Sequence, residues 1–270
     1  MTQVPRGIGP DLASAPEAVA ARGCLLGRPI QLLASTTSTN DDAKRGAKEG
    51  APHGATWVAE QQTAGRGRQG RLWMSPPAES LLFSVLVRGA PAPARLPQIA
   101  LVAGLSVRDA VARALPGADV KIKWPNDVMV HGKKIAGVLV EAVTAGSRVE
   151  AVVVGGGINV HTRAFPAEIA ARATSIALAS PPGADPPDRA RILADVLAAL
   201  DADLHVVVAR GLGVVRARLD AADVLRGRRV RCDSDDEGVA SGMDEEGRLL
   251  VRRDDGVLAR WIAGEVHLIA

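Results

Sequence analysis

Tyrosine is absent from the 270 residues, and the other aromatic residues are few, with two phenylalanines and four tryptophans. Proteins that bind single-stranded nucleic acid stack the bases on aromatic rings, so this composition argues against that class. Charge of one sign is also scarce, because 33 lysines and arginines against 30 acidic residues leave a net charge of +3. A purely electrostatic nucleic-acid binder is therefore excluded, and we predict no nucleic-acid partner.

The sequence also has only two cysteines and no long uninterrupted apolar run. Cys24 and Cys232 stand alone, without the spacing of a zinc site or a disulfide framework, so we predict no bound structural metal. Longer apolar stretches such as Leu96–Leu115 are interrupted by charged residues, and the N-terminus lacks the pattern of a signal peptide. We therefore expect a cytoplasmic protein that has no membrane partner.

Hydrophobic residues make up 47% of the chain, enough to bury a sizeable core without a disulfide or metal staple. Residues 1–29 show no clear periodicity, and we expect a loose N-terminal lead-in there. A main domain is expected over residues 30–222 and a small C-terminal domain over residues 223–270. The boundary is placed near Asp220–Arg226, where the pattern changes to short strands.

The periodicity predicts an α+β fold with a mixed, largely antiparallel sheet. Helices are expected at 41–49, 97–115 and 187–200, and strands at 56–60, 80–87, 120–124, 128–130, 135–142 and 149–154. Short turns between the last four strands imply antiparallel pairing, and the glycine triplet Gly155–Gly157 is expected to end this sheet. Five short strands are expected at 229–233, 238–241, 249–252, 257–260 and 265–269, which indicates a small β-barrel.

A segment rich in glycine and arginine, Thr63–Arg71, has no apolar periodicity and is predicted to be a loop. It contains a formal GxGxxG pattern, but no amphipathic helix follows, as a dinucleotide-binding motif requires. Glycines let the backbone wrap closely around a ligand, and arginines supply permanent charge for a phosphate or carboxylate. The alternative is a solvated basic loop. We expect this loop to be mobile until an anion relieves the repulsion among its arginines.

Polar groups also stand at the ends of two predicted strands. Lys123 lies on a strand that Pro125 ends, and Asn126 and Asp127 follow at the tip, where binding sites commonly lie. An ordinary turn would have the same residues. Lys134 enters an apolar strand, where it needs an anionic partner or ligand, unless its ammonium extends to solvent from the strand end.

Five segments in this order resemble the biotin protein ligase family, in its form without an N-terminal DNA-binding domain. They are Ser38-Thr39-Asn40, Glu60–Trp73, Lys123–Asp127, Lys134–Gly137 and Gly155–Asn159, and Gly264–Leu268 resembles the last strand of the family's C-terminal domain. The resemblance implies the class II synthetase-like fold that biotin and lipoate ligases share, followed by an SH3-like β-barrel. The family often has glycine near Ala78 and an aromatic residue near Leu82, and this chain departs from it at both.

The resemblance implies an enzyme that makes biotinyl-5′-AMP from biotin and ATP, with Mg²⁺ beside the phosphates. It would then transfer biotin to one lysine of a biotin carboxyl carrier domain of a carboxylase. Attack on the α-phosphate needs fixed positive charge rather than a protein nucleophile. A lipoate or octanoate ligase of the same fold and a non-catalytic protein that binds biotinyl-adenylate remain alternatives. The sequence leaves homodimerisation open.

The resemblance also implies which residues hold each ligand. Biotin is expected to contact Ser38, Thr39, Asn40, Gln62, Arg66, Gly67, Arg68 and Lys134. ATP or the adenylate is expected to contact Gly65, Arg71, Trp73, Lys123, Asn126 and Asn159, with Trp73 on the adenine. Catalysis is assigned to Lys134, Arg68 and Asp127, the last as the candidate base for the acceptor lysine. Hydroxyl and amide groups suit the neutral ureido group of biotin.

Overall fold

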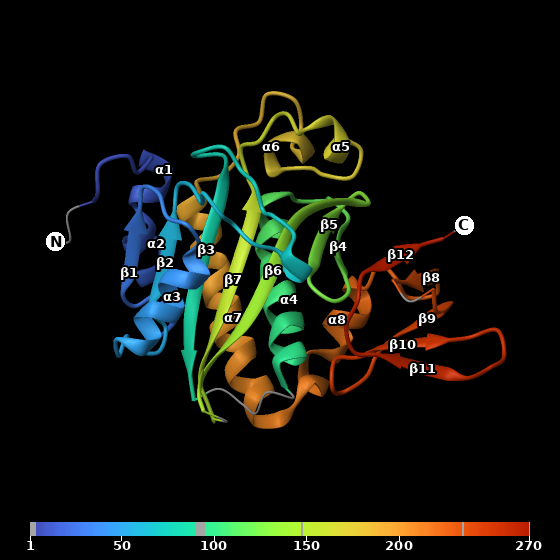
Figure 1. Ribbon diagram of the computed structural model, residues 1–270. Coiled ribbons are helices and arrows are strands. Elements are labelled where there is room, and N and C mark those ends of the chain that lie inside the picture. The colour runs from blue at the N-terminus through green and yellow to red at the C-terminus, as the bar shows by residue number, and fades with distance from the viewer. Residues whose placement is uncertain (1–3, 90–94, 147, 234, 270) are drawn as a thin grey trace.

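The computed structural model describes residues 4–89, 95–146, 148–233 and 235–269 (Figure 1). Its larger unit is built on a seven-stranded sheet in the order β1-β2-β3-β7-β6-β5-β4. The strands are β1 (Ile30–Leu33), β2 (Thr56–Ala59), β3 (Ser80–Arg88), β4 (Val120–Lys123), β5 (Asp127–Val130), β6 (Lys133–Ala145) and β7 (Arg148–Asn159). β1 and β2 pair in parallel and the other neighbours pair antiparallel, which confirms the predicted mixed, largely antiparallel sheet.

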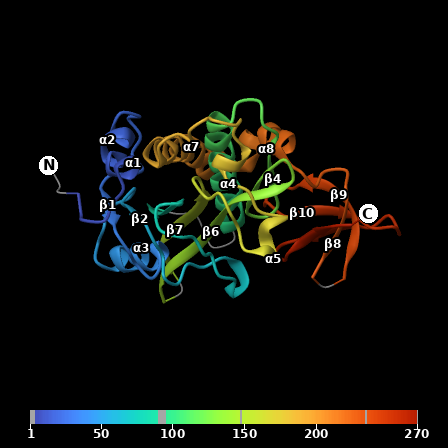
Figure 2. The same ribbon diagram turned by 90° about the horizontal axis from the view of Figure 1, so that it is seen from above.

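Helices cover both faces of this sheet (Figure 2). The helices along one face are α2 (Ala15–Ala20), α4 (Leu96–Ala114), α7 (Arg189–Arg210) and α8 (Arg216–Ala222), while α3 (Thr39–Lys48) lies on the other. Shorter helices are α1 (Pro10–Ala13), α5 (Ala167–Ala170) and α6 (Ile176–Ala179). Among the described residues, none of the helices combines the length and the apolar character that crossing a membrane requires.

Two apolar cores result from this arrangement. The larger core joins α4 and α7 to the sheet and includes Leu105, Leu193 and Val154, all at most 1% exposed. The smaller core lies under α3, where Ala43 packs with Trp57 and neighbouring strand residues. α3 is thereby fixed over β2, β3 and β7, with its first turn near the strand segments that carry the polar motifs.

The N-terminal segment is more ordered than the sequence indicated. Residues 10–20 form α1 and α2, so the expected loose lead-in is wrong for this stretch. Leu12, Ala15 and Val19 are fully buried in the larger core. Helices of four and six residues are too short to produce a recognisable period, and their packing in the larger core, chiefly against α7, stabilises them.

β7 continues through the glycine triplet to Asn159, whereas we expected the triplet to end the sheet. Its backbone pairs with β3 and β6, so the hydrogen bonds of the sheet do not depend on side chains there. A Cβ atom at Gly155 would lie 2.0 Å from Asn40 Oδ1, and one at Gly157 would lie 2.6 Å from Trp73 Cε2. The triplet thus marks a close approach of other residues to the strand.

The C-terminal unit is a five-stranded antiparallel sheet in the order β11-β10-β9-β8-β12, which confirms the five predicted strands. Its strands are β8 (Arg229–Cys232), β9 (Glu237–Met243), β10 (Leu249–Arg252), β11 (Leu258–Trp261) and β12 (Val266–Leu268). Trp124 Nε1 donates to the carbonyl of Gly247 at 2.9 Å, and Gln98 Nε2 donates to that of Glu245 at 2.9 Å. These bonds attach the unit to α4 and to the residue that directly follows β4.

Candidate functional site

A cavity opens on the α3 face of the seven-stranded sheet, beside the segment Thr63–Arg71, hereafter the Gly/Arg loop. The residues that line it are Ser38, Thr39, Asn40, Gln62, Arg66, Gly67, Arg68, Arg71, Leu72, Trp73, Phe83, Asn126, Asp127, Lys134, Gly137, Val138, Leu139, Gly155, Gly156 and Gly157. The fold therefore gathers the polar motifs of α3, the Gly/Arg loop, β5, β6 and β7 around one space. Of the predicted site residues, Gly65, Lys123 and Asn159 do not line it.

One end of the cavity is built from neutral polar side chains. Gln62 Oε1 accepts hydrogen bonds from the Thr39 amide at 2.7 Å and from its hydroxyl at 3.0 Å. Ser84 Oγ donates at 2.5 Å to Asn40 Oδ1 and lies 2.8 Å from Thr39 Oγ1. Ser38, Thr39 and Asn40 are at most 5% exposed. A group that is neutral and carries both donors and acceptors suits this environment.

The Gly/Arg loop is a tight hairpin that is tied to α3. The Gly67 amide donates to the Arg71 carbonyl at 2.6 Å, and the Trp73 amide donates to the Gly65 carbonyl at 2.9 Å. Arg66 binds both carboxylate oxygens of Asp41 at 2.6 Å, and this hydrogen bonding holds the pKa of Asp41 below its usual range. The positive charge of Arg66 is therefore balanced by carboxylates of the protein, Asp41 and Glu141. From the sequence, we had expected an anionic ligand to balance it.

The other end of the cavity is cationic. Lys134 Nζ lies 2.6 Å from Asp127 Oδ1, and Arg68 Nη1 donates to Asn126 Oδ1 at 3.4 Å. Burial lowers the pKa of Arg68, and the negative charge of Asp127 opposes that effect. Burial likewise lowers the pKa of Lys123, again against Asp127. Cations that have lost much of their hydration gain most from an anionic ligand.

Trp73 lies between these two ends, over the backbones of β6 and β7. Gly137 and Gly157 are paired across the two strands, and a Cβ atom on either would approach the indole ring within 3.4 Å. Lys134 Nζ stands 5.7 Å from the ring centroid. Within the described chain, the buried Nε1 of Trp73 has no hydrogen-bond partner. The two glycines thus form a flat platform on which a ring can lie.

The three predicted residues outside the cavity have identifiable positions. Asn159 is 7% exposed and donates to the Thr174 carbonyl at 2.9 Å, so its amide holds the segment after α5 against β7. Gly65 leaves no room for a side chain, because a Cβ atom would lie 2.5 Å from the Trp73 carbonyl oxygen. Lys123 is the last residue of β4, and it is paired in the sheet with Asp127.

Several residues of this site were not found from the sequence. Phe83 lines the cavity from β3, and its ring fills the space that a side chain at Gly156 would need. Ser84 stands within an apolar strand, and no local pattern marks it as a partner of Asn40. At one departure from the family pattern, Ala78 adopts φ +63°, a left-handed conformation that favours glycine.

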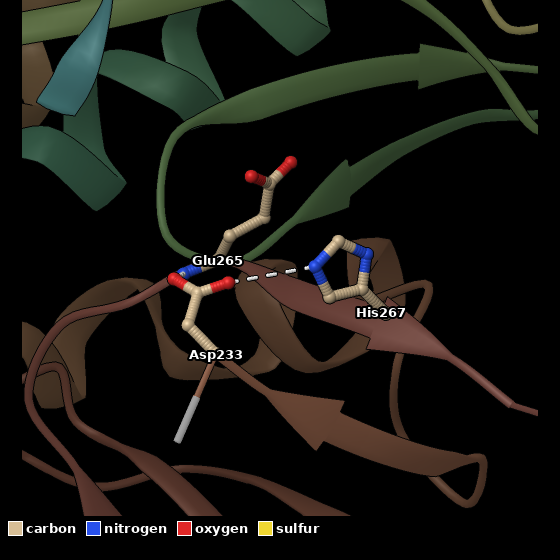
Figure 3. A group of neighbouring side chains, drawn as sticks. All are labelled: Asp233, Glu265 and His267. Atoms are coloured by element: carbon tan, nitrogen blue, oxygen red, sulfur yellow. Dashed lines mark hydrogen bonds and ion pairs between the residues drawn. The ribbon is translucent and has the colours of Figure 1, made fainter. Parts of the chain in front are cut away.

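Beyond the rim, Asp233, Glu265 and His267 of the C-terminal unit are neighbours, and Asp233 and His267 face each other (Figure 3). One ligand-type atom from each lies within 4.8 Å of the others, and His267 Nε2 stands 3.5 Å from Asp233 Oδ1. The two acidic residues are also bound to the Gly/Arg loop, through Gln69 and Arg71. This group therefore joins the two units at the edge of the cavity.

Comparison with known proteins gives a consistent result. Residues 32–159 match the biotin/lipoate A/B protein ligase family, and residues 227–268 match the biotin protein ligase C-terminal domain. A biotin–[acetyl-CoA-carboxylase] ligase of Mycobacterium tuberculosis is 38% identical over 231 residues, which is 82% of each chain. One of Paracoccus denitrificans is 32% identical and covers 83% of this chain and 95% of its own. The biotin protein ligase of Aquifex aeolicus, solved with biotin and ATP, superposes with a TM-score of 0.76 at 30% identity, covering 90% of this chain and 99% of that chain.

Proposed function

The chain belongs to the biotin protein ligases of the biotin/lipoate A/B protein ligase family, and from this we propose how its cavity works. The protein is an ATP-dependent ligase that joins biotin to AMP and then to a protein lysine. We assign the ligand-binding residues from one observation. A single cavity has a neutral polar end at Thr39 and Gln62 and a cationic end at Arg68 and Lys134. Biotin has the same two-ended chemistry, a neutral ureido ring and a carboxylate.

We assign the neutral end to the ureido ring. Its carbonyl and two N–H groups need donors and acceptors without charge, which Ser38, Thr39, Asn40 and Gln62 supply. Arg66 and Gly67 form the wall of the loop over the ligand. Lipoate would place an apolar dithiolane there, which offers these buried polar groups no hydrogen bonds in return for the water that it displaces. This chemistry favours biotin over lipoate or octanoate.

The cationic end is suited to the first half-reaction. A biotin carboxylate oxygen attacks the α-phosphorus of ATP, a P–O bond forms, and pyrophosphate leaves with the electron pair of the broken bond. Lys134 and Arg68 would hold the two anionic groups together and stabilise the charge that develops on the α-phosphate. Arg71, Lys123 and Asn126 would bind the remaining phosphates and ribose, and Trp73 would leave the glycine platform to stack on adenine.

In the second half-reaction the acceptor lysine attacks the carbonyl carbon of the mixed anhydride. The new C–N bond forms, the C–O bond to AMP breaks, and the amine loses a proton. An ordinary lysine has a pKa near 10.4, so only about one amine in a thousand is neutral near pH 7.4. Asp127 is the carboxylate that lines the cavity, and we assign it the orientation or deprotonation of this amine.

The proposed partner is a biotin carboxyl carrier domain of a carboxylase, because the relatives of M. tuberculosis and P. denitrificans are named as acetyl-CoA-carboxylase ligases. Mg²⁺ would enter as the ATP complex and help to neutralise the phosphates. The proposal includes a cytoplasmic location, where ATP and the carrier would meet. We propose no nucleic-acid partner for the protein.

One assay tests this function against its alternatives. Purified protein is incubated with ATP, labelled pyrophosphate and either biotin or lipoate. We expect biotin-dependent incorporation of label into ATP and none with lipoate. Lipoate-dependent exchange would establish the lipoate ligase instead. Absence of exchange with both acids, together with tight binding of biotinyl-adenylate, would indicate a non-catalytic binding protein.

A further inference from the structure

The outer side of the Gly/Arg loop is bound by the C-terminal unit. Arg71 Nη1 donates to Glu265 Oε1 at 2.8 Å, and Gln69 Nε2 donates to Asp233 Oδ2 at 3.4 Å. The residues of the ion pair are 194 positions apart, and both side chains are partly exposed, 52% for Arg71 and 34% for Glu265. A loop that folds over the cavity is thus attached to a carboxylate from a different unit.

Glu265 is held in place from behind. Its backbone amide donates to Asp233 Oδ2 at 2.9 Å, and Asp233 in turn faces His267. Figure 3 shows that the Glu265 side chain extends away from the C-terminal sheet while Asp233 and His267 remain close to it. The carboxylate of Glu265 is therefore presented to the rim of the cavity by a fixed backbone.

The surroundings of this carboxylate are rich in cations. The carboxylate of Glu265 is paired directly with Arg71. Its negative charge also opposes the lowering by burial of the pKa values of Arg68 and Lys123. Asp127 is the other carboxylate whose charge acts on Arg68 and Lys123, and it is already bound to Lys134. Without Glu265, Arg71 would lose its carboxylate partner, and Asp127 would be left to oppose the effect of burial on Arg68 and Lys123.

We propose that Glu265 is a counter-ion that takes the place of the nucleotide phosphates at Arg71 until ATP binds and displaces it. This inference rests on the proposed function, in which Arg71 binds phosphate. A triphosphate carries more charge than one carboxylate and can form paired hydrogen bonds with the guanidinium. A half-exposed ion pair is weak enough to be exchanged for that stronger partner. Glu265 thus positions the loop in the absence of nucleotide and competes with ATP for it.

The decisive variant is Glu265→Gln, which keeps the size of the side chain and removes its charge. We expect its KM for ATP to fall about two- to fivefold, the range set by a partly exposed ion pair. Amide hydrogen exchange over residues 63–71 without nucleotide is expected to become faster. The matched control is Glu246→Gln, which removes a carboxylate paired with Arg248 in the same unit and should change neither measurement.

Arg71→Gln provides the test of mechanism. In that background Glu265→Gln is expected to leave the KM for ATP unchanged, because the group for which carboxylate and phosphate compete is gone. A rise in the KM for ATP in Glu265→Gln itself would show that Glu265 helps to build the nucleotide site, and it would overturn the proposal. An unchanged KM together with unchanged hydrogen exchange would do the same.

Calorimetry with inorganic triphosphate separates this inference from the proposed function. Tighter binding of triphosphate to Glu265→Gln than to the unaltered protein supports the counter-ion even if biotin-dependent pyrophosphate exchange is never observed. If Glu265→Gln binds triphosphate no more tightly than the unaltered protein, and the unaltered protein catalyses biotin-dependent pyrophosphate exchange, the proposed function stands and the proposed role of Glu265 as a counter-ion is refuted.

Discussion

The ammonium of Lys134 lies 2.6 Å from the carboxylate of Asp127. Lys134, the cation proposed for the first half-reaction, is therefore paired with Asp127, the base proposed for the second. Asp127 begins β5 and Lys134 is near the start of β6, so the two strands fix the pair. Binding of two anionic substrates would draw Lys134 toward them and leave the Asp127 carboxylate available to the acceptor amine. The two steps would then use the pair in turn.

Lys134→Gln tests the first step. It retains a hydrogen-bond donor and removes the charge, and loss of one preorganised contact of this kind costs on the order of a hundredfold in rate. We expect that loss in biotin-dependent pyrophosphate exchange, and little recovery in Lys134→Arg because the guanidinium fork is larger. Lys133→Gln, an exposed neighbour, is the control. Near-normal exchange by a folded Lys134→Gln protein would remove Lys134 from the mechanism.

Asp127→Asn tests the second step. An amide cannot accept a proton, and general-base catalysis typically contributes a factor of about 10² to 10⁴. We expect single-turnover transfer from preformed biotinyl-5′-AMP to a carrier domain to slow by about a hundredfold, with a smaller effect on pyrophosphate exchange. Asp119→Asn, at an exposed position beside β4, serves as the control. Equal losses in both half-reactions would show that Asp127 acts only by positioning Lys134.

Gly157→Ala tests the glycine platform. Its new methyl group would lie 2.6 Å from the Trp73 ring, in the space where a ligand ring or the indole must lie. We expect the Kd for biotin to rise about tenfold or more, measured by calorimetry, while the fold remains intact. The control is Gly104→Ala in α4, where a Cβ atom meets nothing within 4 Å. Unchanged biotin affinity would mean that the ligand does not approach this strand.

Trp73 is expected to report ligand binding through its fluorescence. Its Nε1 is buried without a partner among the described residues, and leaving such a donor unpaired costs about 1–3 kcal/mol, which favours a rearrangement when a ligand arrives. Addition of biotin and ATP should shift the emission of the unaltered protein but not that of Trp73→Phe. The same shift in Trp73→Phe would assign the signal to one of the other three tryptophans.

Stability in acid is expected to depend on Asp11. Burial alone would raise the pKa of this carboxyl, but hydrogen bonds from Arg189 and His161 outweigh it and lower the pKa to about 2 from an ordinary value of 3.8. The resulting stabilisation, on the order of 2 kcal/mol, is present above about pH 4 and is lost as the pH falls toward 2. The free energy of unfolding of Asp11→Asn should therefore vary less over this interval, whereas exposed Asp185→Asn should behave as the unaltered protein.

Much of the fold could be predicted because its signals are local. A continuous apolar run marked β3, short apolar runs bounded by turn residues marked the strands from β4 to β7, and turn residues marked the five strands of the C-terminal unit. The glycine triplet was visible as a motif but was misplaced as a sheet end, since glycine favours turns and close contacts alike. α1 and α2 were missed because their helicity depends on packing against α7.

The chemistry of the cavity was likewise determined by residue types in sequence, since a neutral ring needs hydroxyl and amide groups and phosphates need arginine and lysine. Which charges face each other was decided only by tertiary structure. Arg66 meets Asp41 across 25 positions, and Arg71 meets Glu265 across 194. An ion pair depends on distance in space, and no local pattern encodes the distance between remote segments. The first pair therefore became visible only when the Gly/Arg loop was placed against α3, and the second only when the C-terminal unit was placed beside that loop.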